Sequence, residues 1–388
     1  MLKPPQDPAD YRDPEPFTVE AKEHRFTFYP HGADRMQALI KHIQGAEDTL
    51  WVYYYMFQDD QSGTVIRDCL VEAAERGVEV HLVIDDFGSD APDPFFRPLI
   101  DAGGRFSRFQ ARFSVRYLVR NHQKFVIADS KRVLSGGFNV SDHYFKPPQD
   151  NGWCDMGVLI DGPVADQFCD WWELVKGWAE SEGSQFRRIR EMVKEWDEGD
   201  GPVRLLVGAP LLRRSHWAWR FKRDLSNAQR VDMVTAYYSP TRSIRYLLRR
   251  VARRKGVRLI AAGKSDFEAT IATARLLYKR LLRSGAKIFE FQPCKLHMKL
   301  IVIDDIAYFG SANLDKRSIR INAELMVRVE DAEVAAALRE LMDHMQAASM
   351  EITPKWYEEK STFLTRLGWR LTYLATFADY RVSRSLNI

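Results

Sequence analysis

The chain has 388 residues, of which 45% are hydrophobic and 28% are charged, so it can bury one large core or two ordinary ones and is not a disordered protein. The formal net charge of +4 is too small to indicate a partner by itself. The four cysteines are scattered without a Cys-x-x-Cys pair, which argues against a disulfide framework or a zinc cluster and favours a reducing compartment.

The first part of the chain predicts a β-α-β unit. Residues 1–24 are polar and proline-rich, and we expect an irregular arm there rather than a signal peptide or a membrane anchor. A buried strand over Leu50–Met56, a helix over Val65–Glu75 and a second buried strand over Val78–Ile84 follow. This order predicts a parallel sheet. The sequence contains no uncharged apolar run of about 18 residues, so no membrane-spanning helix is expected.

The second half of the chain repeats the first. A strand over Val231–Tyr238 and a helix over Ser243–Lys255 come in the same order. Because internal repeats usually fix the architecture, we expect two lobes that pack face to face as a pseudo-dimer. The predicted boundaries are an arm at 1–24, a first lobe at 25–180, a charged linker at 181–201, a second lobe at 202–350 and a tail at 351–388.

Each half contains one copy of a motif in which His-x-Lys opens a buried strand, Asp follows it, and a turn of small residues ends in Asn. The copies are NHQKFVIADSKRVLSGGFN, from Asn121 to Asn139, and LHMKLIVIDDIAYFGSAN, from Leu296 to Asn313. A single His near a Lys is usually an ordinary residue, but two copies in matching contexts indicate a function. The candidate site residues are His122, Lys124, Asp129 and Asn139 in the first copy and His297, Lys299, Asp304 and Asn313 in the second.

Two imidazoles and two ammonium groups that converge on one point suit a phosphoryl group. The lysines and the amides of Asn139 and Asn313 could donate hydrogen bonds to its non-bridging oxygens. One histidine could attack phosphorus to form a phosphohistidine, while the other exchanges a proton with the leaving and incoming alcohols. Asp129 and Asp304 follow a core strand, a position that favours an internal ion pair over a metal ligand, so neither a metal nor a cofactor is predicted.

A nucleophilic imidazole also needs an acceptor at its second nitrogen, which fixes the tautomer and stabilises the cation. Asp155 and Glu324 stand at equivalent places after the two motifs. They could be solvated carboxylates at strand ends, but the symmetry of the repeat favours a role in orienting the histidines.

The two motifs resemble the paired HxKxxxxD motifs of the phospholipase D superfamily. Their surroundings, Arg120–Tyr144 and Gly310–Leu325, are similar to those of bacterial cardiolipin synthases, in the shorter form without N-terminal transmembrane helices. The resemblance covers roughly residues 25–346. It implies an α/β fold of two tandem α-β-α sandwich lobes related by a pseudo-two-fold axis, with the site at their interface. It also implies metal-independent transfer of a phosphatidyl group from one phosphatidylglycerol to another, with His122 as the nucleophile and His297 as the general acid and then base.

Stretches that combine cations with apolar or aromatic residues could address anionic phospholipid, namely phosphatidylglycerol and cardiolipin, at the cytoplasmic face of the inner membrane. They lie between Arg105 and Arg120, along Ser243–Lys255, and in the tail, where Leu364, Leu367, Leu371 and Leu374 form a stripe. Each also has a plainer interpretation, as a solvated face or as a helix docked on the core. Two other functions stay open: a phospholipase D that only hydrolyses phospholipid, and a phosphodiesterase acting on nucleic acid. Nucleic acid is the less favoured partner, and the oligomeric state is not predicted.

Overall fold

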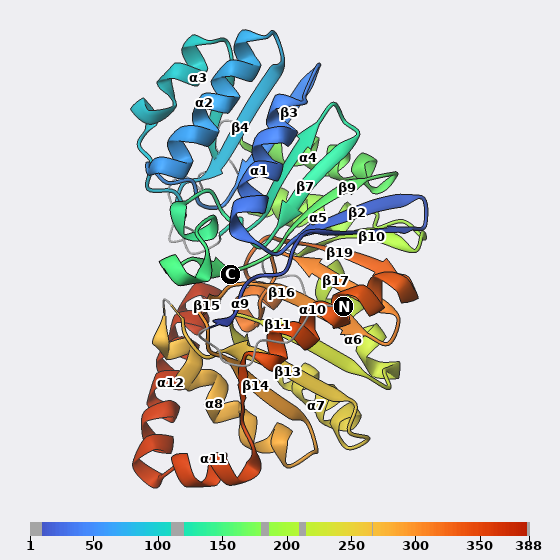
Figure 1. Ribbon diagram of the computed structural model, residues 1–388, viewed down its shortest axis with the longest axis vertical. Coiled ribbons are helices and arrows are strands. Elements are labelled where there is room, and N and C mark those ends of the chain that lie inside the picture. The colour runs from blue at the N-terminus through green and yellow to red at the C-terminus, as the bar shows by residue number, and fades with distance from the viewer. Residues whose placement is uncertain (1–9, 110–119, 180–185, 209–214, 266, 386–388) are drawn as a thin grey trace.

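The computed structural model describes residues 10–109, 120–179, 186–208, 215–265 and 267–385. The chain forms two lobes, each built on an eight-stranded sheet, stacked one above the other in Figure 1. The first lobe contains β1 (Phe17–Ala21), β2 (His24–Tyr29), α1 (Gly32–Gln44), β3 (Thr49–Tyr54), α2 (Gln61–Glu75), β4 (Glu79–Asp85), α3 (Arg97–Asp101), β5 (Arg105–Phe109), β6 (Lys124–Ala128), β7 (Arg132–Gly136), β8 (Trp153–Cys154), β9 (Gly157–Asp161) and α4 (Val164–Ala179).

The helix α5 (Phe186–Glu195) connects the two lobes. The second lobe and the tail contain β10 (Val203–Gly208), α6 (His216–Asn227), β11 (Val231–Thr235), β12 (Tyr238–Ser239), α7 (Arg242–Ala252), β13 (Val257–Ala262), α8 (Glu268–Leu282), β14 (Lys287–Phe291), β15 (Lys295–Leu296), β16 (Lys299–Ile303), β17 (Ile306–Gly310), β18 (Leu314–Asp315), α9 (Lys316–Arg320), β19 (Glu324–Glu330), α10 (Ala332–Ala347), β20 (Ser349–Glu351), α11 (Pro354–Lys360) and α12 (Phe363–Ser385). Among the described helices, none is both long and apolar enough to span a bilayer.

The two sheets have matching strand orders, β1-β2-β9-β7-β6-β3-β4-β5 and β10-β19-β17-β16-β11-β13-β14-β20. Only three strands of each, β3-β4-β5 and β11-β13-β14, are parallel to one another. The prediction of a parallel sheet was therefore wrong for the sheet as a whole. After the motif strand β6 or β16 the chain turns back at once into β7 or β17, and such a hairpin is necessarily antiparallel.

The predicted irregular arm is partly ordered. Strands β1 and β2 pair as a hairpin whose turn residues, Lys22 and Glu23, have positive φ values of 52° and 61°. Tyr11 is buried and packs edge-on against Phe291 of the second lobe, with ring centroids 5.0 Å apart. The sequence concealed this hairpin because its turn lacks the Asn-Gly or Asp-Gly pair that usually marks one. The predicted linker likewise contains a helix, α5.

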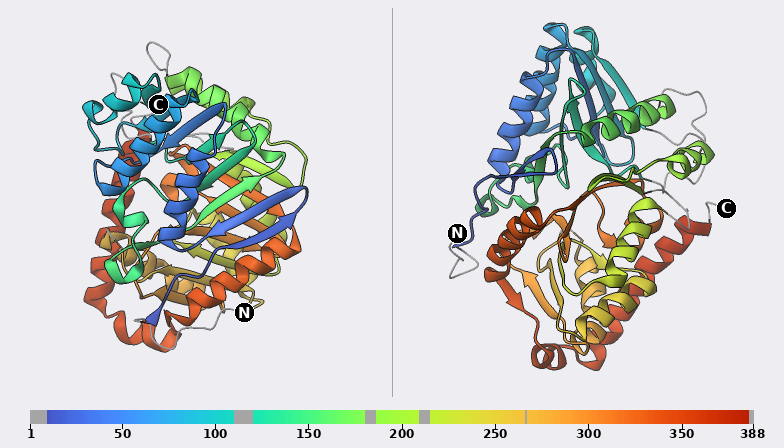
Figure 2. Two further views of the ribbon diagram at one scale, coloured as in Figure 1. Left: turned by 45° about the horizontal axis from the view of Figure 1, so that its top comes forward. Right: turned by 90° about the vertical axis from the view of Figure 1, so that its right-hand side faces the viewer.

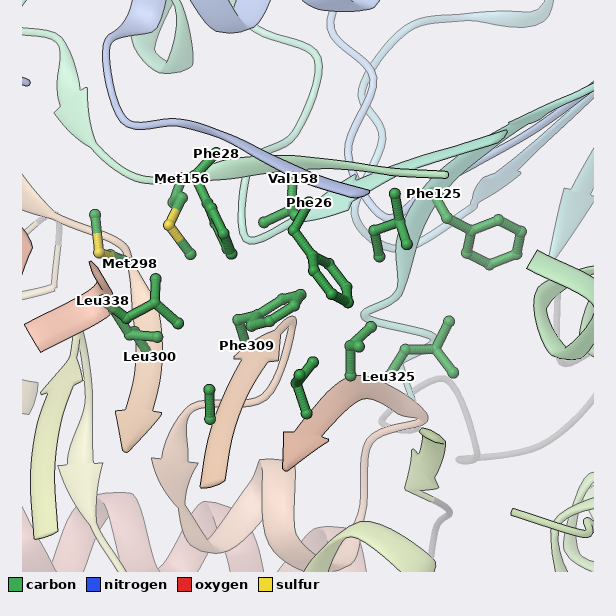
Figure 3. Close-up of a cluster of buried hydrophobic side chains, with 14 of the residues drawn as sticks. Phe26, Phe28, Phe125, Met156, Val158, Met298, Leu300, Phe309, Leu325 and Leu338 are labelled. Carbon is green, nitrogen blue, oxygen red and sulfur yellow. The ribbon is translucent and has the colours of Figure 1, made fainter. Parts of the chain in front are cut away.

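The two sheets pack against each other through a continuous apolar core. Phe309 from β17 lies between Phe26 and Phe28 from β2, at ring-centroid distances of 6.2 and 5.5 Å (Figure 3). The same core includes Met156 and Val158 of the first lobe and Met298, Leu300, Leu325 and Leu338 of the second. Helices α1 and α2 cover one face of the first sheet, and α4 covers part of the other (Figure 2). Large complementary apolar surfaces thus fix how the two motifs meet.

Candidate active site

The two histidines precede the motif strands, in segments that cross to the opposite lobe. The amide of His122 donates to the carbonyl of Ala323 at 2.9 Å, and the amide of His297 donates to the carbonyl of Cys154 at 2.8 Å. Strand β15, just before His297, pairs in parallel with β8 of the first lobe. The backbone of each histidine is therefore hydrogen-bonded to the other lobe, at the residue just before Glu324 or Asp155.

The acidic candidates lie beside the histidines, in a crossed arrangement. Nδ1 of His122 lies 3.1 Å from Oε2 of Glu324, and Nδ1 of His297 lies 2.6 Å from Oδ2 of Asp155. Both carboxylates are fully buried. A carboxylate that accepts from Nδ1–H fixes the tautomer and leaves Nε2 as the nucleophilic or proton-carrying nitrogen. Each of these contacts joins the two lobes, and the orienting role of the two carboxylates stays a prediction.

The two histidines are neutral imidazoles that lie among two lysines and two buried carboxylates. Burial lowers the pKa of His122 to about 4, and the ammonium of Lys124 is the second cause of this shift. Burial and Lys299 lower the pKa of His297 to about 4 as well. The lysine of each lobe also lowers the pKa of the other lobe's histidine, so the two half-sites face one another. A bound phosphodiester would have the opposite effect, because its negative charge favours a protonated imidazole.

The lysines and the carboxylates affect each other's pKa values. Burial lowers the pKa of Lys124 to about 7. Burial by itself would raise the pKa of Asp155, but Lys299 and His297 outweigh it and bring this pKa down to about 2. The ammonium of Lys124 donates to the carbonyl of His122 at 2.5 Å, and that of Lys299 donates to the carbonyl of His297. Within the described residues, no three His, Cys, Asp or Glu side chains gather in a way that could hold a metal ion.

One position of the repeated motif differs between the lobes for a steric reason. A Cβ atom on Gly137 would lie 2.4 Å from Oδ1 of Asp155, so only glycine lets this carboxylate approach. The equivalent Ser311 has room for its side chain and donates its hydroxyl to Glu324 at 2.6 Å. Asn322 adds a second donor to Glu324 at 3.2 Å. Side chains thus hold the longer glutamate, whereas the shorter aspartate lies against Gly137 and accepts from the backbone amide of Met156 at 2.8 Å.

The two motif asparagines are buried near the histidines. Nδ2 of Asn139 donates to the hydroxyl of Tyr144 at 2.8 Å, and its Oδ1 accepts from the amide of Met56. The backbone N–H of Asn313 donates to the hydroxyl of Ser318 at 3.2 Å. Asn139 therefore supports the loops around the site, and phosphate binding by either asparagine stays a prediction.

The motif aspartates, by contrast, lie at the far ends of strands β6 and β16 from the histidines. Their carboxylates accept hydrogen bonds from backbone N–H groups next to strands β3 and β11: Glu47, Asp48 and Thr49 for Asp129, and Gln229 and Arg230 for Asp304. Both have positive φ values, 52° and 48°, which turn the chain into the next strand. Among the described residues, both carboxylates thus bind backbone amides away from the histidines, instead of forming the internal ion pair that the sequence favoured.

Several residues around the histidines were missed. The ring centroid of Tyr55 lies 4.8 Å from that of His122, and those of Tyr144 and Trp153 lie 5.1 and 5.5 Å from that of His297. The buried Arg35 donates to the carbonyls of Asp155 and Tyr144 at 2.5 and 2.6 Å. Nothing in the sequence separates Tyr55 from its strand neighbours, or Arg35 from an ordinary helix residue.

The comparisons with known proteins agree with this geometry. A family model described as "Cardiolipin synthase, PLD-like domain" matches residues 39–172 and 221–346, which is more than half of the chain. The chain belongs to this family. It is a phosphatidyltransferase-type enzyme of the phospholipase D superfamily, as the motifs indicated.

Two curated relatives illustrate the similarity to other cardiolipin synthase family members. Cardiolipin synthase A of Pseudomonas putida (strain GB-1) is 29% identical over 366 residues, covering 89% of this chain and 73% of the relative. Cardiolipin synthase A of Pseudomonas aeruginosa (strain LESB58) is 29% identical over 376 residues, covering 92% and 74%. The crystal structure of phosphatidylserine synthase from Haemophilus influenzae Rd KW20 superposes with a TM-score of 0.74 at 14% identity, over 95% of this chain and 96% of that one. That likeness confirms the predicted fold of two phospholipase D-like lobes.

Proposed function

We propose that the protein makes cardiolipin from two phosphatidylglycerol molecules and releases glycerol, without a metal ion. The observation that carries this proposal is the crossed pair of contacts, His122 with Glu324 and His297 with Asp155, around two buried lysines. Membership of the cardiolipin synthase family supports phospholipid as the substrate class. The names of the relatives support transfer to a lipid alcohol as the outcome.

In the first step, Nε2 of His122 attacks phosphorus, an N–P bond forms, and the P–O bond to the glycerol headgroup breaks. His297, protonated at Nε2, gives its proton to the departing oxygen, so glycerol leaves as a neutral alcohol. Glu324 stabilises the positive charge that develops on His122. Lys124 and Lys299 stabilise the negative charge that builds on the non-bridging oxygens.

In the second step, the headgroup hydroxyl of another phosphatidylglycerol attacks the same phosphorus. The neutral His297 takes the proton of this hydroxyl, a new P–O bond forms, and the N–P bond to His122 breaks. Asp155 stabilises the imidazolium that results. His297 is then protonated again, and the cycle is ready to repeat with no net change in charge.

The first step needs a protonated His297, and this protonation requires a bound phosphate. Burial, and in addition the two lysines, lower the pKa of His297 and keep it neutral when no phosphate is bound. The negative charge of the diester compensates for those lysines and raises the pKa of the imidazole. Substrate binding would therefore load the general acid with its proton.

Hydrolysis to phosphatidic acid is the alternative, because water can replace the lipid alcohol in the second step. We place the protein at the cytoplasmic face of the inner membrane as a peripheral enzyme, where both phosphatidylglycerol molecules are available. Cleavage of nucleic acid would use the same two steps, but neither relative carries a name that supports it.

The test is incubation of purified protein with phosphatidylglycerol vesicles in the presence of a chelator, followed by mass spectrometry of the lipids. Cardiolipin together with glycerol is the expected result. Phosphatidic acid alone would assign hydrolysis, and nicking of plasmid DNA without lipid turnover would refute the proposal. His122→Ala and His297→Ala should each abolish turnover while the far-ultraviolet circular dichroism spectrum stays unchanged.

A further inference from the structure

Helices α7, α8 and α12 of the second lobe enclose a groove of about 840 Å³ that is lined by an unusual number of cations. Eight of the lining residues are basic: Arg242, Arg245, Arg249, Lys279, Arg280, Arg283, Arg366 and Arg370. The lining contains no Asp or Glu. In the part of the chain that the structure describes, none of these eight side chains forms an ion pair with a carboxylate. So many cations repel one another, and an anionic ligand relieves that repulsion.

Helix α12 forms one wall of this groove and carries an exposed apolar stripe beside it. Leu364, Leu367, Leu371 and Leu374 recur at helical spacing, and their exposed fractions are 76%, 42%, 60% and 57%. Phe363 extends the stripe with an exposed fraction of 72%. Leu367 and Phe363 also line the groove, so the apolar stripe and the cations form one surface.

The other side of α12 is fixed to the second lobe. Trp369 packs against its core and lies 5.9 Å from Tyr357 of α11, measured between ring centroids. Tyr373 accepts a hydrogen bond from Lys316 at 2.7 Å. Helix α12 is therefore docked on the second lobe, which is one of the two interpretations that the sequence allowed. The leucines stay exposed because Trp369 and Tyr373, on the other side of the helix, make the contacts with the lobe.

The groove lies next to the end of the second motif. Tyr238, which lines it, pairs with Leu314 in the short β12–β18 ladder, one residue after the motif asparagine Asn313. Helix α12 runs along the side of the second lobe towards the level at which the lobes meet (Figures 1 and 2). A lipid surface that touched α12 would thus lie close to the end of the second motif.

We infer that the arginine groove and the leucine stripe of α12 bind an anionic phospholipid surface, with phosphate headgroups in the groove and the leucines among the acyl chains. The lipid class rests on the proposed function. Cations favour any polyanion, but the exposed leucines favour a membrane over nucleic acid, since nucleic acid offers no apolar layer for them to enter. The structure thereby assigns the face of the second lobe through which substrate arrives.

The test is co-sedimentation of the full chain with vesicles, in a His297→Ala background that prevents turnover. The leucine variant combines Leu364→Ser, Leu367→Ser and Leu371→Ser, and the arginine variant combines Arg245→Gln, Arg280→Gln and Arg370→Gln. Each variant should bind vesicles of equal parts phosphatidylglycerol and phosphatidylcholine about 100-fold more weakly than the parent. The leucine variant loses three side chains that would enter the acyl layer, and the arginine variant loses three positive charges at the lipid surface. A charge-matched control with Lys41→Gln, Arg97→Gln and Lys131→Gln in the first lobe should lose less than about threefold.

The same substitutions in the active background should leave hydrolysis of soluble bis(p-nitrophenyl) phosphate within about twofold, which shows that the site is intact. Parental binding by the leucine or arginine variant would overturn the inference, as would equal binding of the parent to pure phosphatidylcholine. If the leucine variant changed a dimer into a monomer and bound vesicles normally, the stripe would belong to a second copy. If the arginine variant lost only duplex DNA, the groove would belong to nucleic acid. If the active parent bound vesicles but formed no cardiolipin, the proposed function would be refuted and the proposed lipid-binding surface would be supported.

Discussion

The contact between Asp155 and His297 gives a quantitative prediction. The two side chains lie 2.6 Å apart, and Lys299 and His297 hold the pKa of the buried aspartate at about 2 against its ordinary 3.8. A shift of about two pKa units corresponds to roughly 2–3 kcal/mol in favour of the charged carboxylate. Asp155→Asn removes that charge, and its amide can hold the imidazole in the wrong tautomer. We expect kcat to fall about 1,000-fold, or about 4 kcal/mol, of which the charge supplies the larger part.

The assay can separate the two chemical steps. With a phosphatidyl-p-nitrophenol substrate, the leaving group departs as an anion and needs no proton from His297. Asp155→Asn should therefore keep a rapid burst of one p-nitrophenolate per protein and then turn over slowly, because attack by the second alcohol still needs the base. Glu324→Gln should lose the burst itself, because it weakens the nucleophile His122.

Opposite behaviour of the two variants would refute the assignment of His122 as the nucleophile. If both variants kept more than a tenth of the parental kcat, the crossed carboxylates would not act through the histidines at all. Thermal melting of each variant is the control, since loss of a buried charge-assisted hydrogen bond is expected to lower the free energy of unfolding by about 2 kcal/mol.

Three other changes test the rest of the site and the fold. Because burial brings the pKa of Lys124 to about 7, its positive charge is present below that pH and lost above it. The value of kcat/KM should therefore fall about tenfold per pH unit above 7, and in Lys124→Arg this fall should begin only above pH 9. Asp129→Asn removes a backbone cap rather than a catalytic group, so urea titration should show a loss of about 1–2 kcal/mol while kcat stays within twofold; a large loss of kcat would return Asp129 to the site. Phe309→Ala opens a cavity between the sheets and should cost about 3–5 kcal/mol in the same titration, whereas a loss below 1 kcal/mol would mean that the lobes are not held by this core.

The repeated motif allowed the two half-sites to be predicted because its chemistry is local. His-x-Lys, the buried strand and the small-residue turn lie within a few residues of one another, so their spacing is visible in the sequence. The same reasoning failed for the ion pair expected at Asp129, because its carboxylate accepts from backbone amides that precede it by 80 to 82 residues in the sequence. It also missed the antiparallel half of each sheet, which depends on where strands β7 and β17 pair after the turn.

The pairing of Asp155 with His297 was beyond the reach of sequence reasoning. The repeat showed that these residues are equivalent to Glu324 and His122, but equivalence does not say whether a contact stays within a lobe or crosses to the other. That choice is made by the apolar surfaces of the two sheets around Phe309. Arg35 was missed for a different reason: the carbonyl groups that it binds belong to its own lobe but follow it by 109 and 120 residues in the sequence.

The crossed contacts bear on how such a protein could have arisen. A single-copy ancestor would have needed two chains to complete either imidazole–carboxylate pair. In the duplicated chain, a change to the carboxylate of one lobe acts on the histidine of the other lobe. A chimera that exchanged one lobe for a foreign one could retain every motif residue and still be inactive.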